Sequence, residues 1–166
     1  MRIDITAIAG INGAYLEVSR DIPTETLGSG IAGIELGDTA HADLKIEYIE
    51  GNIAVKGRVK GKYTTQCGRC LKDIRDEFDI EVNEMFIHIS KDGDNADDYL
   101  YEGGHIDLSV PLIDNILLSF PGVILCSKDC NGLCEVCGAN LNETECTCEK
   151  QDINIKMEKL KDFFNQ

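Results

Sequence analysis

The sequence predicts an α+β fold: an antiparallel β-sheet with a long hairpin, one or two packing helices, and a C-terminal zinc-knuckle segment. Three observations predict this fold. Apolar and polar side chains alternate through residues 44–82, which is typical of half-buried strands. Apolar side chains recur at helical spacing within residues 113–120, and six of the eight cysteines lie within residues 126–148.

The first 40 residues are weakly patterned. Two alternating stretches, at residues 3–7 and 15–19, predict two short strands. The glycine-rich residues 27–33 lack the lysine and the spacing of a phosphate-binding loop, so they predict an ordinary loop.

The middle of the chain predicts a meander of strands. A strand at residues 44–48 turns at Glu50-Gly51-Asn52 into a long strand at 53–63, and residues 74–82 return antiparallel to it. The motif Cys67-Gly68-Arg69-Cys70 therefore lies at the tip of a hairpin.

One strand of this hairpin carries a basic stripe: Lys56, Arg58, Lys60 and Lys62. If Cys67 faces Cys70 across a two-residue turn, the basic stripe meets acids on the next strand. The opposed pairs would be Lys60 with Glu77, Arg58 with Asp79, and Lys56 with Glu81. This register favours cross-strand ion pairs over an RNA-binding face. Lys62 then faces Arg75, so the tip stays basic, and the candidate RNA contacts are Lys62, Arg69, Lys72 and Arg75.

The helices come later in the chain. Residues 90–104, rich in Asp and Gly, predict a solvated loop. The apolar face of residues 113–120 predicts a helix that Asp107 or Ser109 caps, with Pro111 in its first turn and Pro121-Gly122 after its end. A second amphipathic stretch predicts a C-terminal helix at 151–166. The resulting division is a β-rich domain with a helix at 1–125, a cysteine-rich zinc-binding segment at 126–150, and this helix, together forming one compact unit.

The cysteines predict zinc rather than disulfides. The N-terminus has no signal peptide, and no stretch reaches the roughly 20 apolar residues of a membrane span, so we expect a cytoplasmic protein with reduced thiols. The expected metal ligands are Cys67, Cys70, Cys126, Cys130, Cys134, Cys137, Cys146 and Cys148. The last four are spaced to form one compact site, and pairing Cys126 and Cys130 with Cys67 and Cys70 would pin the C-terminal segment to the hairpin tip. Sites made of four sulfurs are structural, so we expect two structural zinc ions and no catalytic residue.

Composition limits the partners. The net charge is −14, and such an acidic chain is repelled by nucleic acid at long range. Any RNA contact must therefore be local or made through a basic partner protein. We expect no membrane partner and no small-molecule substrate.

Three blocks of sequence resemble the YceD family, also called domain-of-unknown-function family 177. They are Cys67-Gly68-Arg69-Cys70-Leu71, residues 106–108 leading into 117–121, and the cysteine-rich residues 125–142 followed by Cys146-Thr147-Cys148. The resemblance implies a bacterial or organellar cytoplasmic protein that is needed for accumulation of 23S ribosomal RNA. Members of the family are not known to be enzymes.

Two classes of function are therefore open. The first is a non-enzymatic factor in large-subunit ribosome biogenesis that binds precursor rRNA, or a pre-50S particle through a basic ribosomal protein. The second is a thiol-redox or zinc-handling protein that uses the C-x-x-C motifs. The resemblance favours the first, and so does the place of Cys67 and Cys70 at a hairpin tip, where no helix N-terminus activates a thiol.

Overall fold

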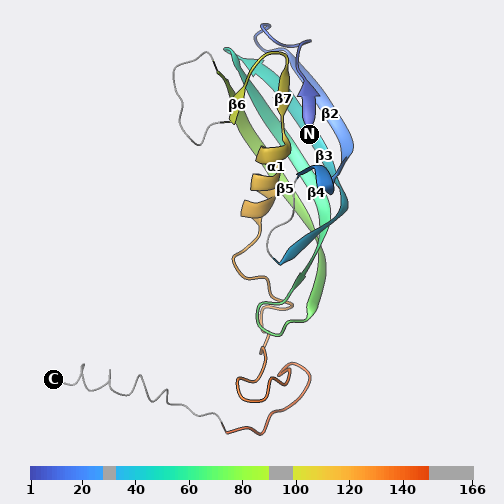
Figure 1. The fold of residues 1–166 in the computed structure, drawn as a ribbon, viewed down its shortest axis with the longest axis vertical. Coiled ribbons are helices and arrows are strands. Elements are labelled where there is room, and N and C mark those ends of the chain that lie inside the picture. The colour runs from blue at the N-terminus through green and yellow to red at the C-terminus, as the bar shows by residue number, and fades with distance from the viewer. Residues whose placement is uncertain (28–32, 90–98, 150–166) are drawn as a thin grey trace, which may run out of the picture.

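The computed structural model describes residues 1–27, 33–89 and 99–149 and confirms the α+β fold class (Figure 1). In chain order the elements are β1 (Arg2–Asp4), β2 (Tyr15–Pro23), the 3₁₀ helix η1 (Thr24–Leu27), β3 (Ile34–Ile49), β4 (Asn52–Gln66), β5 (Asp73–His88), β6 (Tyr99–Tyr101), β7 (His105–Asp107) and α1 (Ser109–Ser119). The large sheet has the order β2-β3-β4-β5-β6, and β1 pairs with β7 in a small second sheet. None of the helices described here is long and apolar enough to cross a membrane.

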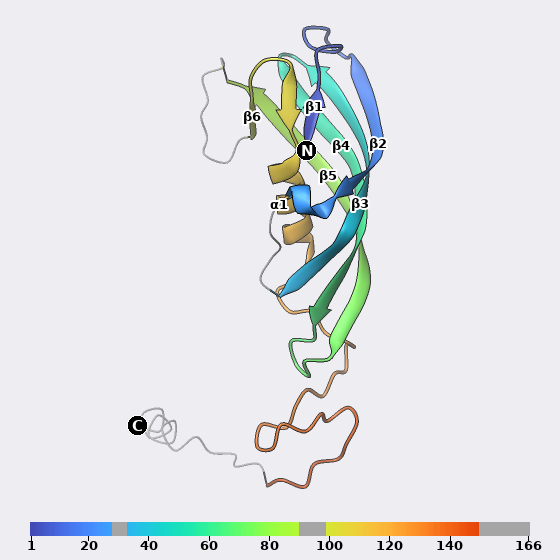
Figure 2. The ribbon, with the colours of Figure 1, turned by 45° about the vertical axis from the view of Figure 1, so that its right-hand side comes forward.

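The large sheet is built on three long antiparallel strands, β3, β4 and β5, of 16, 15 and 16 residues. Their side chains alternate between buried and exposed, as the sequence pattern predicts for a sheet with one covered face. Figure 2 shows α1, η1 and β1 together on that face, while the opposite face is open to solvent. The core lies between these layers and includes Ile5, Ile46, Val59, Leu112 and Ile116, all fully buried.

The predicted register of the hairpin is wrong by two residues. The structure pairs Lys60 with Asp79 rather than Glu77, and Lys62 with Glu77 rather than Arg75. The cause is the tip, because the strands end at Gln66 and Asp73 and leave a longer turn than the two residues assumed. A shift by an even number of residues keeps every side chain on its predicted face of the sheet.

Because the faces are preserved, acids still lie opposite Arg58, Lys60 and Lys62. The predicted pair of Lys56 with Glu81 is wrong, since Lys56 faces Asn83. Asp79 accepts both Arg58 Nε at 3.0 Å and Lys60 Nζ at 3.4 Å, and Glu77 lies 3.8 Å from Lys62 Nζ. Residue Arg58 reaches Asp79 diagonally, since its directly opposed residue is Glu81. These side chains are well exposed, so the pairs contribute little to stability. The stripe is largely neutralised on its own sheet.

Helix α1 starts and ends where the sequence indicates. Its N-cap position is Leu108, and neither predicted capping residue occupies it; instead the Asp107 carboxylate accepts the Ser109 backbone N–H at 2.9 Å. This bond, reinforced by the amino terminus, lowers the pKa of Asp107 to about 2. The helix ends at Ser119, and Phe120 turns into the sheet, with its ring edge-on to Tyr63 at 4.7 Å between centroids.

The predicted loop at residues 90–104 is wrong near its end, because residues 99–101 form strand β6, which pairs parallel to β5. Strand β7 follows at residues 105–107, where the sequence predicted no strand. Three-residue strands are too short for their alternation to be recognised in a sequence. The predicted C-terminal helix at 151–166 lies outside the described residues.

We expect Ile116→Ala to lower the free energy of unfolding by about 2–5 kcal/mol, because it removes a fully buried side chain between α1 and the sheet. Urea denaturation followed by far-UV circular dichroism measures this change. The matched control is Leu118→Ala on the same helix, where the side chain is 84% exposed and the expected change is within about 0.5 kcal/mol. Equal effects of the two substitutions would contradict the packing of α1 described here.

Candidate metal centres

The hairpin tip is a compact turn closed by backbone hydrogen bonds. Cys67 N–H donates to Lys72 O at 2.9 Å, and Leu71 N–H donates to Cys67 O at 3.0 Å. Gly68 N–H donates to Ile124 O at 2.9 Å, which joins the tip to the segment that follows α1. A Cβ atom on residue 68 would lie 2.6 Å from a Val123 methyl group, so this close approach depends on glycine.

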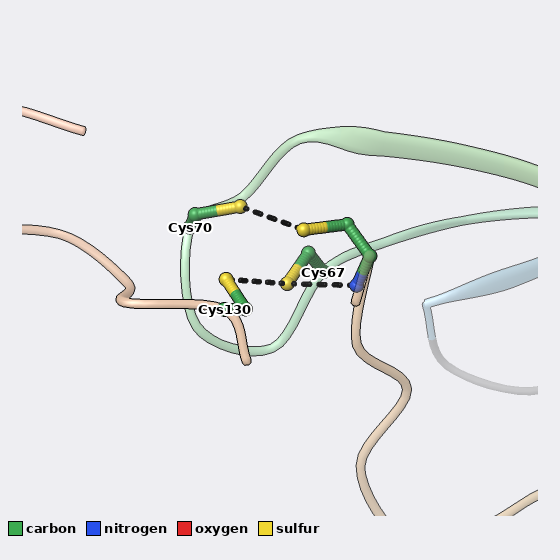
Figure 3. A group of neighbouring side chains, drawn as sticks. Cys67, Cys70 and Cys130 are labelled. Carbon is green, nitrogen blue, oxygen red and sulfur yellow. Dashed lines mark hydrogen bonds between the residues drawn. The ribbon is translucent and has the colours of Figure 1, made fainter. Parts of the chain in front are cut away.

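The first group of sulfurs, cluster A, joins two distant parts of the chain. It consists of Cys67 and Cys70 from the hairpin tip and Cys126 and Cys130 from the segment after α1. Figure 3 shows the sulfurs of Cys67, Cys70 and Cys130 facing one another. The Sγ–Sγ distances are 3.8 Å between Cys67 and Cys130 and 3.6 Å between Cys70 and Cys126. Of the four side chains, only that of Cys126 is exposed.

The second group, cluster B, is made within 15 residues of chain. It consists of Cys134, Cys137, Cys146 and Cys148. The sulfur of Cys146 lies 3.6 Å from that of Cys137 and 3.3 Å from that of Cys134. Cluster B extends beyond the end of the sheet at which the hairpin tip lies (Figure 1), and it is more exposed than cluster A.

Both clusters fit a tetrahedral metal ion. All eight cysteines are free thiols, and the sulfurs in each cluster lie within 4.8 Å of one another. A disulfide requires about 2.05 Å between sulfurs, whereas four sulfurs at about 2.3 Å from one zinc ion lie about 3.8 Å apart. The observed distances match the second geometry. Each cluster could therefore hold a metal ion, and four thiolates in a tetrahedral arrangement are the donor set of a structural zinc site.

The surroundings of cluster A partly favour thiolates. Burial acts to raise the pKa of Cys67, but the backbone N–H groups of Cys70, Arg69 and Cys126 donate to its sulfur and lower the pKa to about 6. The pKa of Cys126 is raised to about 12, first by the sulfur of Cys70 and then by that of Cys130. Four negative charges so close together repel one another, and a bound divalent cation would remove this repulsion.

Cluster B shows the same division. Backbone N–H groups of Cys137 and Val136 lower the pKa of Cys134 to about 6. The neighbouring sulfurs of Cys146 and Cys137 raise the pKa of Cys148 to about 12. In each cluster, backbone N–H groups thus lower the pKa of one sulfur, and neighbouring sulfurs raise the pKa of another.

A side chain that sequence reasoning missed, Asn142, reaches cluster A from the segment between Cys137 and Cys146. Its amide Nδ2 donates to Cys130 Sγ at 3.4 Å, and its Oδ1 accepts the backbone N–H of Asn131 at 2.8 Å. The signal was present in the run Asn140-Leu141-Asn142, two amides placed between cysteines of one cluster. Hydrogen-bond donors to metal-binding sulfurs tune such sites, so Asn142 could support a metal ion held by cluster A.

The four candidate RNA contacts, Lys62, Arg69, Lys72 and Arg75, differ in whether their side chains already have partners in the structure. Lys62 has an acid opposite, Glu77, so the prediction that it has none is wrong. Arg69 Nη1 donates to Cys130 O at 3.0 Å and so helps to hold cluster A. Lys72 and Arg75 are exposed, and within residues 1–27, 33–89 and 99–149 neither forms a salt bridge.

Comparison with known proteins places the clusters inside a family match. Residues 55–164 match the model of the family described as large ribosomal RNA subunit accumulation protein YceD. An uncharacterised protein of Mycobacterium leprae is 27% identical over 145 residues, which cover 83% of this chain and 66% of that protein. An uncharacterised protein of Mycobacterium tuberculosis is 29% identical over 150 residues, covering 85% of this chain and 70% of that protein. This chain thus spans about two thirds of the length of these relatives.

A plant protein matches a shorter stretch. The Zea mays protein named large ribosomal RNA subunit accumulation protein YCED homolog 1, chloroplastic, is 43% identical over 49 residues, 29% of this chain and 17% of that protein. No solved structure shows a significant match.

We expect Asn142→Ala to lower the zinc affinity of cluster A by about tenfold, because Cys130 loses its side-chain donor. Competition with a chromophoric chelator measures the affinity. Asn83→Ala, an exposed amide on β5, is the control and should leave the affinity unchanged. Equal zinc affinities for the Asn142 variant and the wild type would show that the hydrogen bond from Asn142 to Cys130 does not support the metal site.

Proposed function

The chain belongs to the YceD family, and we propose that it promotes accumulation of large-subunit (23S) ribosomal RNA as a non-enzymatic factor that binds precursor rRNA or a basic ribosomal protein. The family match to residues 55–164 carries this proposal, because it covers the hairpin tip, α1 and both cysteine clusters. The printed name of the maize relative supports the same role in ribosome biogenesis. We place this activity in the cytoplasm, where bacterial ribosomes assemble.

The charge of the chain limits how it can bind. A net charge of −14 opposes general attraction to RNA, and each tetrathiolate zinc site would add about −2 more. Three of the four cations of the basic stripe are paired with acids: Arg58 and Lys60 with Asp79, and Lys62 with Glu77. The contact is therefore local, or it is made through a basic ribosomal protein.

A binding role fits the cysteines better than thiol-redox catalysis does. A redox C-x-x-C motif opens a helix, whose N-terminus activates the thiol that attacks the substrate. Cys67 and Cys70 lie instead in the turn between β4 and β5, and they face two further sulfurs. A thiolate that shares one metal ion with three others is not available to attack a substrate disulfide.

Two structural zinc ions form part of the proposal. We expect two zinc equivalents per chain by elemental analysis of protein purified without chelator, because each cluster offers a complete set of four sulfurs. The double variant Cys146→Ser, Cys148→Ser should retain one equivalent, since cluster A is left intact. Less than half an equivalent in the wild type, together with four disulfides in the mass spectrum, would contradict the zinc assignment.

We expect the tagged protein to sediment with pre-50S particles and not with small-subunit particles. Sucrose gradients of lysates, run with and without ribonuclease treatment, test this. Release by ribonuclease indicates an RNA contact, and retention on the residual protein indicates a ribosomal protein contact. Recovery of the protein only in the free fractions at the top of the gradient would refute the proposed function.

A further inference from the structure

The two C-x-x-C turns share two backbone features but place different residue types at the position after the second cysteine. In each turn, the residue after the second cysteine adopts a left-handed conformation, with φ of 59° at Leu71 and 74° at Gly138. Each also donates its N–H to the carbonyl of the first cysteine, Leu71 to Cys67 at 3.0 Å and Gly138 to Cys134 at 2.8 Å. The turn therefore requires a residue in the left-handed conformation. Cluster B has glycine there, which adopts this conformation without strain, whereas cluster A has leucine.

Leucine is unfavourable at this position. A left-handed conformation costs a residue with a Cβ atom free energy that glycine does not lose. Among residues 1–27, 33–89 and 99–149, the only other non-glycine residue with positive φ is Glu50. Burial does not compensate for the strain, because Leu71 is 58% exposed. The fold alone would be served at least as well by glycine, so the leucine side chain has a use outside the fold.

The surroundings of Leu71 indicate which partner it meets. Residues 67–72 contain two cations, Arg69 and Lys72, and no acid. Both are exposed, one on each side of Leu71 in the chain. Arg69 uses one guanidinium N–H for Cys130 O, which fixes the side chain and leaves its other donors available. The tip lies at the end of the sheet away from β6 and β7 (Figure 1).

An exposed apolar side chain between two cations suits RNA. Leucine is among the apolar side chains that insert beside bases at unstacked steps, while cations contact the adjacent phosphates. We propose that Leu71 packs against an unpaired base of ribosomal RNA and that Arg69 and Lys72 contact the flanking phosphates. This inference rests on the proposed function and names the atoms that make its RNA contact. It also explains how a chain of net charge −14 can bind RNA, since only the tip needs to approach the RNA closely.

The test is Leu71→Gly in the full-length, metal-loaded chain. We expect its dissociation constant for in vitro transcribed 23S rRNA, measured by filter binding, to rise by at least about fivefold, as for loss of one base contact. Its thermal midpoint should stay the same or rise by up to about 4 °C, because the backbone strain is relieved. The control is Leu118→Ala, which removes another exposed leucine and should change neither quantity.

The outcomes separate this inference from the proposed function. If wild type binds the RNA and Leu71→Gly binds equally well, the inference is wrong and the proposed function stands. A fall in the thermal midpoint of Leu71→Gly would also overturn the inference, because the leucine would then be structural. If wild type binds pre-50S particles but not the naked RNA, the partner of Leu71 is a protein and the RNA assignment is overturned. Failure to bind either RNA or particles refutes the proposed function itself.

Discussion

The close approach of four sulfurs in cluster A is the constraint that sets how the hairpin tip and the chain after α1 are arranged. Two of them come from the tip of the β4–β5 hairpin and two from a segment nearly 60 residues later in the chain. Bringing them within 4.8 Å requires the two backbones to touch, which Gly68 allows by lacking a Cβ atom toward Val123. Gly132 does the same from the other segment, where an added Cβ atom would lie 3.2 Å from Arg69 O. The chain after α1 is thereby held on the hairpin tip, and cluster B follows from there.

Much of the fold could be predicted because its patterns are local. Alternation indicates β4 and β5, a helical repeat indicates α1, and cysteine spacing separates the two clusters. The start of β3 was missed because a register shift between Leu36 and Ala40 interrupts the alternation. The pairing of β1 with β7 joins residues more than 100 positions apart, and no local pattern reports it.

The hairpin register shows how a site can override a simple rule. A two-residue turn between Cys67 and Cys70 is the usual expectation for a tight hairpin. In the structure, the Cys67 backbone N–H donates a hydrogen bond to Lys72 O, so the turn is longer than two residues. The longer turn winds around the sulfurs and directs backbone N–H groups toward that of Cys67. Left-handed Leu71 completes this turn, and nothing in its residue type indicates that conformation. The two groups of cysteines could therefore be predicted from the sequence, whereas the conformation of the turn that holds Cys67 and Cys70 could not.

Hydrogen–deuterium exchange of the metal-loaded chain, before and after treatment with a strong chelator, tests most directly whether cluster A holds the C-terminal segment on the hairpin. The account predicts that the amides of Gly68 and Cys126 lose protection after chelation, because they bond to Ile124 O and Cys67 Sγ across the cluster. The amides of Val59 and Ile80, which belong to the central β4–β5 pairing, should stay protected. Unchanged protection of Gly68 and Cys126 after complete metal removal would contradict the account.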